Sequence, residues 1–321
     1  MNILIVHAHH EARSFSSALK DRAAATLRAL GHQVEISDLY AMRFDPVSNR
    51  SNFTTVADAE FLKQQSEEAH ATQHDGFAPA LSAEMEKVLR ADLLIFNFPL
   101  WWFGMPAILK GWVDRVFAYG KMYDYEKRFE HGIGLGKRAL VTMTTGGGSS
   151  RYDGNGSNPP LSTILAPIHH GIFWYNGFSP LPPFVGYAVA NLSDDERTTL
   201  LDEYEQYLST LDELQPFVLP PLRDFNGETG ADRFGRWLLE VQNANVLDRV
   251  RIAALQREGT VVDVWLSPED GAAPAGWIVL RAESRDDADA ITRTLLPSNV
   301  VPFALREVAR PLQLELATAP A

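Results

Sequence analysis

Apolar residues in the first two thirds of the chain fall into short runs that are separated by longer amphipathic stretches. The short runs predict strands at residues 2–8, 33–37, 92–98, 138–144 and 184–189. Apolar residues at helical spacing predict helices at residues 14–30, 79–90, 105–118, 160–175 and 193–213. Strands that alternate with helices in this way predict parallel βαβ units, with helices on both faces of one sheet.

The predicted strands fit a doubly wound parallel sheet with the strand order 2-1-3-4-5. In such a sheet a ligand binds at the carboxyl ends of the strands, where the strand order reverses. The loops that follow residues 2–8, 92–98 and 138–144 all leave the sheet at this edge. We therefore expect one ligand site, built from loops that are far apart in the sequence.

The pattern changes beyond residue 215. Residues 41–78 already interrupt the first domain with a polar excursion, in which residues 57–70 have helical character, and residues 216–233 form a Pro-rich and polar linker. After the linker, strands are predicted at 237–241, 261–266, 277–282 and 303–308, and helices at 247–257 and 285–296. This βαββαβ order predicts a smaller, ferredoxin-like α+β domain over residues 234–321.

Composition excludes several classes of function. The net charge of −12 argues against a nucleic-acid or anionic-membrane partner. The chain has no cysteine, which excludes disulfides, thiolate catalysis and cysteine-ligated metal centres. His7 and His9 share one face of a strand, but no third ligand is evident, so we expect no metal site. We also expect no signal peptide and no membrane span, and hence a cytoplasmic protein.

Three aromatic residues, Trp101, Trp102 and Phe103, follow the strand at 92–98, immediately before the helix at 105–118. One aromatic residue there could simply be part of the core. Three in succession at a strand–helix turn cannot all face inward, so we interpret them as a platform for a flat aromatic ligand.

The two other loops carry hydroxyl groups and glycines. Residues 14–16 place serines at a helix N-terminus, where hydroxyl and N–H groups bind an anion, although simple N-capping by Ser14 or Ser16 is the alternative. Residues 144–147, Thr-Thr-Gly-Gly, offer hydroxyls and backbone that a ligand can approach closely, although an ordinary turn is the alternative.

Together these segments resemble the flavin-dependent NAD(P)H:quinone oxidoreductases, the family of DT-diaphorase and its bacterial relatives. The matching segments occur in the same order in this chain, at residues 8–15, 37–42, 98–112 and 144–147, followed by Tyr152. The resemblance covers about residues 1–215. It implies a flavodoxin-like fold, a homodimer, and two-electron ping-pong transfer of hydride from NAD(P)H through a bound flavin to a quinone.

The resemblance also implies the cofactor and the residues that hold it. Arg197 matches an arginine at the adenine end of FAD, which favours FAD, with FMN as the alternative. The implied cofactor-binding residues are His9, Ser14, Phe15, Ser16, Leu100, Trp101, Trp102, Phe103, Thr144, Thr145, Gly146, Gly147, Tyr152 and Arg197. At Trp101 the family usually has glutamine.

Tyr152 matches the family's catalytic tyrosine, whose phenol can stabilise the negative charge that grows on a flavin as it is reduced. Asn158 stands where mammalian members carry a catalytic histidine, and asparagine cannot take up a proton near neutral pH. The implied substrate-binding residues are Phe103, Tyr123, Tyr125 and Tyr175.

Other functions share these features. An azo- or nitroreductase would use the same flavin chemistry, and a flavin-binding regulatory subunit of a potassium-efflux transporter or a flavodoxin-like electron carrier would have the same fold. Residues 234–321 weakly resemble the dimeric α/β-barrel domains of muconolactone-isomerase and YCII-related proteins, through their element order and residues 259–265. We expect this domain to pair subunits or to act as a lid.

Overall fold

The computed structural model describes residues 1–217, 219, 235–241, 251–252, 255, 260–266, 276–282, 284–296 and 304–308. The chain divides into two compact units, Met1–Phe217 and Val218–Ala321. The predicted linker at 216–233 lies almost entirely outside the described residues.

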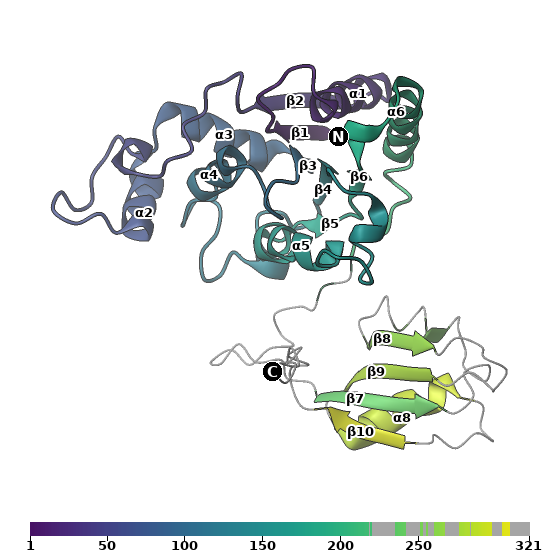
Figure 1. The fold of residues 1–321 in the computed structure, drawn as a ribbon. Helices are drawn as coiled ribbons and strands as arrows, with labels where there is room; N and C mark the ends of the chain where they lie inside the picture. Colours follow the sequence, from purple (N-terminus) through teal and green to yellow (C-terminus); the bar gives the residue numbers. More distant parts are fainter. Residues whose placement is uncertain are drawn as a thin grey trace, which may run out of the picture. The chain divides into compact units, whose positions relative to one another are not determined.

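The first unit is a doubly wound parallel sheet, as predicted (Figure 1). Its strand order is β2-β1-β3-β4, followed by two short strands that both pair with β4. The strands are β1 (Asn2–His7), β2 (Gln33–Asp38), β3 (Leu93–Pro99), β4 (Arg138–Thr144), β5 (Ser179–Pro180) and β6 (Phe184–Gly186). The carboxyl ends of β1, β3 and β4 lie at the same edge of the sheet, where the candidate loops begin.

The last position of the sheet differs from the prediction of one strand at 184–189. Strand β5 pairs with the start of β4 and β6 pairs with its end. Between them lie Pro182 and Pro183, which have no N–H to donate to a ladder. The prolines thus divide the predicted edge strand into two.

Helices cover both faces of the sheet (Figure 1). On one face, α1 (Phe15–Ala29) and α6 (Asp194–Ser209) enclose a hydrophobic cluster with β1 and β3. On the other face, α3 (Pro79–Arg90), α4 (Ala107–Val116) and α5 (Leu161–Ile168) enclose a second cluster. The excursion at 41–78 contains α2 (Gln64–His74), which begins later than the expected 57–70.

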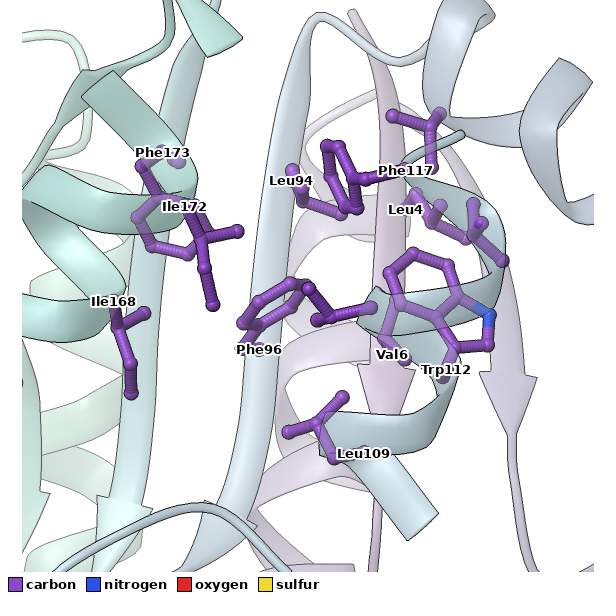
Figure 2. Close-up of a cluster of buried hydrophobic side chains, with 14 of the residues drawn as sticks. Leu4, Val6, Leu94, Phe96, Leu109, Trp112, Phe117, Ile168, Ile172 and Phe173 are labelled. Atoms are coloured by element: carbon purple, nitrogen blue, oxygen red, sulfur yellow. The ribbon is translucent and has the colours of Figure 1, made fainter. Parts of the chain in front are cut away.

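Phe96 of β3 lies at the centre of the second cluster (Figure 2). Its ring meets Trp112 of α4 edge-on at 5.9 Å and Phe173 at 4.9 Å between centroids. Trp112 is fully buried and donates its indole N–H to Glu84 of α3 at 2.9 Å. This packing fixes α4, and with it the aromatic loop from which α4 emerges.

The predicted helix at 160–175 is not one regular helix. It begins as α5, widens into a π-helix at His169–Phe173 and ends in a 3₁₀ turn at Trp174–Asn176. Pro167 lies inside α5, and a proline in a helix removes one backbone hydrogen bond, which accounts for the irregularity that follows. Other 3₁₀ turns span Arg50–Asn52, Phe129–His131, Ser149–Arg151 and Val189–Asn191.

The second unit contains an antiparallel sheet in the order β10-β7-β9-β8 and a helix, α8 (Arg285–Leu295). The strands are β7 (Gly235–Val241), β8 (Val261–Leu266), β9 (Gly276–Ala282) and β10 (Ala304–Val308). Of the predicted helix at 247–257, residues 251, 252 and 255 are described, and they are helical. The likeness to dimeric α/β-barrel domains stays a prediction. No helix among the described residues has the length and apolar character needed to cross a membrane.

Candidate functional site

A pocket of about 560 Å³ lies beside the N-terminus of α1. It is lined from the loop after β1, from the start of α1, from the end of β4 and from residues 189–201. Its lining includes the predicted cofactor residues His9, Ser14, Phe15, Ser16, Thr144 and Arg197. The structure thus brings together residues that are up to 188 positions apart (197 − 9) in the sequence.

The serines at the start of α1 have different roles. Ser14 is the N-cap, and its hydroxyl accepts a hydrogen bond from Ser17 N–H at 3.1 Å. Ser16 lies inside the helix, and its hydroxyl is 2.9 Å from Thr144 Oγ1, which links α1 to the end of β4. The first N–H groups of a helix have no partner within it and carry a partial positive charge. The pocket therefore offers an anion both hydroxyls and N–H donors.

The charged side chains of the pocket suit a diphosphate. Arg13 and Arg197 both line it, with Asp194 as the acidic neighbour, and Arg197 Nη1 lies 3.2 Å from Asp194 Oδ1. Arg13 forms an ion pair with Glu11 at 3.4 Å, and its side chain is almost fully exposed. Sequence reasoning missed Arg13, although its position directly before the N-cap was a usable signal.

The aromatic loop forms a tight turn from Trp101 to Gly104. Trp101 N–H donates to Gly104 O at 3.1 Å, and Gly104 N–H donates to Trp101 O at 3.0 Å. The two residues between them, Trp102 and Phe103, have φ angles of 51° and 56°. Positive φ at both central positions is the geometry of a type I′ turn, which normally contains asparagine and glycine. Two aromatic residues held there are strained, which points to a function for their side chains.

The two central residues of the strained turn, Trp102 and Phe103, expose their side chains to solvent. Trp102 is 98% exposed and Phe103 is 48% exposed, which confirms that the three aromatic residues do not all face the core. Trp101 instead packs near His9 and His10, with ring centroids 5.9 and 5.7 Å away. Since His9 also lines the pocket, it joins the pocket to the aromatic turn. Burial and the neighbouring His10 lower the pKa of His9.

Residues 144–148 form a loop that is tied to residues 186–189 by backbone hydrogen bonds. Thr145 donates its hydroxyl to Gly147 O at 2.7 Å, so that hydroxyl holds the loop rather than standing free. A Cβ at Gly147 would lie 3.3 Å from Tyr152 Oη, so glycine lets the tyrosine ring pack against the loop. Tyr152 is 8% exposed, and Asn158 N–H donates to Arg151 O beside it at 3.0 Å.

The predicted substrate tyrosines form a separate aromatic cluster. Tyr123 lies 5.7 Å from Tyr175, and Tyr119 connects Tyr123 to Tyr125 at 5.6 and 6.2 Å. Burial raises the pKa of Tyr123. The residues that line the pocket beside α1 include none of these tyrosines, and none of Trp102, Phe103, Gly146, Gly147 or Tyr152. Among the described residues no group of histidines and acidic residues could hold a metal ion.

Residues 1–209 match the model of a protein family described as having a flavodoxin-like fold. NAD(P)H dehydrogenase (quinone) 1 of Cavia porcellus is 39% identical over 230 residues, which are 71% of this chain and 84% of that protein. The chain belongs to the flavodoxin-like family of NAD(P)H:quinone oxidoreductases.

Other relatives match a similar share of the chain. Human ribosyldihydronicotinamide dehydrogenase (quinone) is 37% identical over 215 residues, which are 67% of this chain and 93% of that protein. The crystal structure of a proposed quinone reductase from Klebsiella pneumoniae is 35% identical, has a TM-score of 0.69, and covers 73% of this chain and 94% of that one. As a member of the family, the chain is an oxidoreductase. The family match ends at residue 209, before the second unit begins.

Proposed function

We propose that this member of the family is a flavin-dependent NAD(P)H:quinone oxidoreductase that binds FAD in the pocket beside α1. The observation that carries the proposal is the convergence of predicted cofactor residues from separate segments on this one pocket. When bound, the flavin accepts a hydride from NAD(P)H and passes two electrons to a quinone. The chain's own residues bind the cofactor, stack the substrates and stabilise charge.

We infer FAD rather than FMN from the residues that line the pocket. Besides the α1 N-terminus, which suits phosphate, the lining includes Arg197, Thr198 and Leu201 of α6. We propose that these α6 residues contact the adenosine half of FAD, which FMN lacks.

Arg197 should make the pocket selective for FAD over FMN. We expect apoprotein to bind FAD at least about tenfold more tightly than FMN, since one charge-assisted hydrogen bond is worth roughly 1.5–3 kcal/mol. Fluorescence titration measures both affinities. Arg197→Ala should bring the two affinities closer together, because it should weaken the binding of FAD and leave the binding of FMN unchanged. The substitution Arg90→Ala, which removes an exposed ion pair with Glu35 away from the pocket, is the matched control. Equal affinity for FAD and FMN would contradict the assignment.

We further propose a homodimer with its substrate slot between subunits. Within one chain the outward-facing Trp102 and Phe103 are highly exposed, and the tyrosine cluster of residues 119, 123, 125 and 175 does not line the same pocket. Pairing would cover Trp102 and complete an apolar slot for nicotinamide and quinone in turn. Sedimentation at micromolar concentration should give a dimer, whereas a fully active monomer would overturn this arrangement. A cytoplasmic location remains a prediction.

Tyr152 is proposed as the residue that stabilises charge on the reduced flavin. Loss of one fully engaged donor of this type costs about 10²–10³ in rate, and nearby backbone N–H groups would partly replace it, so Tyr152→Phe should slow flavin reduction roughly tenfold. FAD content should barely change, because the residues at the start of α1 and Arg197, which line the pocket, are proposed to hold the cofactor. Stopped-flow reduction by NAD(P)H is the measurement.

The companion variant is Asn158→His, which restores the histidine of the mammalian relatives. It should speed reduction or give its pH profile a histidine-like pKa. If Tyr152→Phe reduces its flavin at the wild-type rate, Tyr152 is a packing residue only.

A further inference from the structure

His7 is a buried histidine that contacts the cofactor pocket only through other residues. It is the last residue of β1 and is 1% exposed. Its Nδ1 lies 2.5 Å from Asn97 Oδ1 of β3, and its Nε2 lies 3.2 Å from Ser17 Oγ of α1. Both ring nitrogens thus have polar partners, as expected for a buried imidazole, because burying a polar group without a hydrogen-bond partner costs free energy.

Ser17 connects this histidine to the pocket. Its hydroxyl donates to Glu11 O at 2.9 Å and lies 3.0 Å from Ser14 Oγ. Ser14, in turn, lines the pocket. A continuous path of polar contacts therefore runs from Asn97 through His7 and Ser17 to the residue that caps α1.

The number of protons on this path depends on the charge of His7. Asn97 Oδ1 can only accept, so His7 Nδ1 carries a proton. The Ser17 hydroxyl has one proton, and when it donates to Glu11 O its oxygen can meet Nε2 favourably only if Nε2 also carries a proton. All three contacts are thus satisfied together by the imidazolium form. With neutral His7, Ser17 has to give up its bond to Glu11 O in order to donate to Nε2.

The same choice controls Ser14. With neutral His7, Ser14 is the hydroxyl that donates to Ser17 Oγ, so its proton points away from the pocket. With protonated His7, Nε2–H donates to Ser17 Oγ, so the Ser17 proton is no longer needed by His7 and can be given to Ser14 Oγ as well as to Glu11 O. The Ser14 hydroxyl can then turn its own proton toward a ligand oxygen. An anion in the pocket would therefore favour the protonated ring, and the protonated ring would favour the anion.

We propose that His7 is a positioning residue that couples proton uptake to binding of the FAD diphosphate, through Ser17 and Ser14. This inference rests on the proposed FAD site. From the sequence, His7 was considered only as a metal ligand, and no third ligand was evident. Its position behind the N-terminus of α1 instead suits a residue that positions Ser17 and Ser14.

The groups around His7 are consistent with a ring that is neutral before the ligand binds. Burial lowers the pKa of His7, and Lys20 of α1 and His9 lower it further. The hydrogen bond to Asn97 and the carboxylate of Asp38 on β2 act in the opposite direction. Asn97, the residue that faces the ring from β3, carries no charge. Added negative charge in the pocket would raise the pKa of His7 in the complex.

If FAD binding and protonation of His7 favour each other, the affinity for FAD depends on pH. FAD affinity is highest below the pKa of His7 in the free protein and falls as the pH rises through its pKa in the complex. Between the two values, binding takes up protons from solution. Each unit by which FAD raises the pKa corresponds to about tenfold in affinity across the window. We therefore expect FAD to bind more weakly at a pH above the pKa of His7 in the complex than at a pH below its pKa in the free protein.

Isothermal titration of the full-length apoprotein with FAD, at about pH 6.5 in two buffers of different ionisation enthalpy, measures the protons taken up. Wild type should take up a measurable fraction of a proton. Ser17→Ala keeps His7 but breaks the path, and His7→Gln removes the titrating ring, so both should lose the same part of the uptake. What remains belongs to His9, which lines the pocket itself.

His169→Gln is the matched control, because His169 is also buried, with a pKa lowered to about 4, but does not line the pocket. It should keep the wild-type uptake. If His7→Gln fails to fold, NMR titration of the His7 ring in wild type and in Ser17→Ala replaces it, and FAD should raise its pKa in wild type alone. FAD that binds with equal uptake in wild type and Ser17→Ala would overturn the inference. Absence of FAD binding to wild type would overturn the proposed function itself.

Discussion

Replacing Trp102 with asparagine and Phe103 with glycine is expected to lower kcat/KM for quinone about 100-fold while making the protein more stable. Both residues have positive φ in a type I′ turn, for which the new pair is the preferred sequence. Relief of strain at two residues should raise the free energy of unfolding by about 1–3 kcal/mol. The loss in kcat/KM follows because two aromatic stacking surfaces together contribute about 2–3 kcal/mol to substrate binding.

Urea unfolding and steady-state kinetics of the double variant test this trade of stability for function. Arg43→Gly is the matched control, since Arg43 also has positive φ, at 51°, in an exposed turn outside the candidate site. It should gain about 1–2 kcal/mol of stability with unchanged kinetics. A double variant that keeps its activity would show that the aromatic turn does not serve the substrate.

Trp112→Ala is expected to cost about 3–5 kcal/mol of stability, because a large cavity opens beside Phe96 in the core. It also removes the indole N–H that Glu84 accepts at 2.9 Å, although Lys87 Nζ remains 2.5 Å from that carboxylate. Trp112→Phe keeps much of the packing and isolates the lost hydrogen bond, so it should cost about 1–3 kcal/mol.

Denaturant unfolding of the two Trp112 variants, followed by far-UV circular dichroism, gives both free energies. Phe61→Ala, which removes an exposed aromatic residue, is the control and should be close to neutral. A Trp112→Ala variant that loses less than about 1 kcal/mol would mean that α4 is not held by this core.

The sequence was sufficient to predict the parallel sheet, because each of its buried strands is a short apolar run between amphipathic helices. It was less informative where local chemistry interrupts a pattern. Pro182 and Pro183 divide the predicted edge strand, and Pro167 precedes a π-helix where a regular helix was expected. Periodicity averages over such positions, so it predicts that an element exists more securely than where it ends.

Some residues of the candidate site could likewise be predicted from the sequence, and others could not. Residues 14–16 were predicted from their place at a helix N-terminus and Arg197 from the family resemblance, and all of them line one pocket. Arg13 was missed although it lies directly before the N-cap of α1. The link from His7 to Ser14 could not be predicted, because it depends on contacts between neighbouring elements that spacing does not show. The positive φ of Trp102 was also beyond prediction, since aromatic residues are disfavoured in such a turn.

Anaerobic titration of the FAD-loaded protein tests whether one bound flavin passes electrons from NAD(P)H to a quinone. Addition of NADH or NADPH should bleach the visible absorbance of the flavin, and subsequent addition of one equivalent of benzoquinone should restore it, with no third component present. This result would show that one bound cofactor serves donor and acceptor in turn. Absorbance that does not change with either nicotinamide, or that stays bleached after the quinone, would contradict electron transfer from NAD(P)H to quinone through bound FAD.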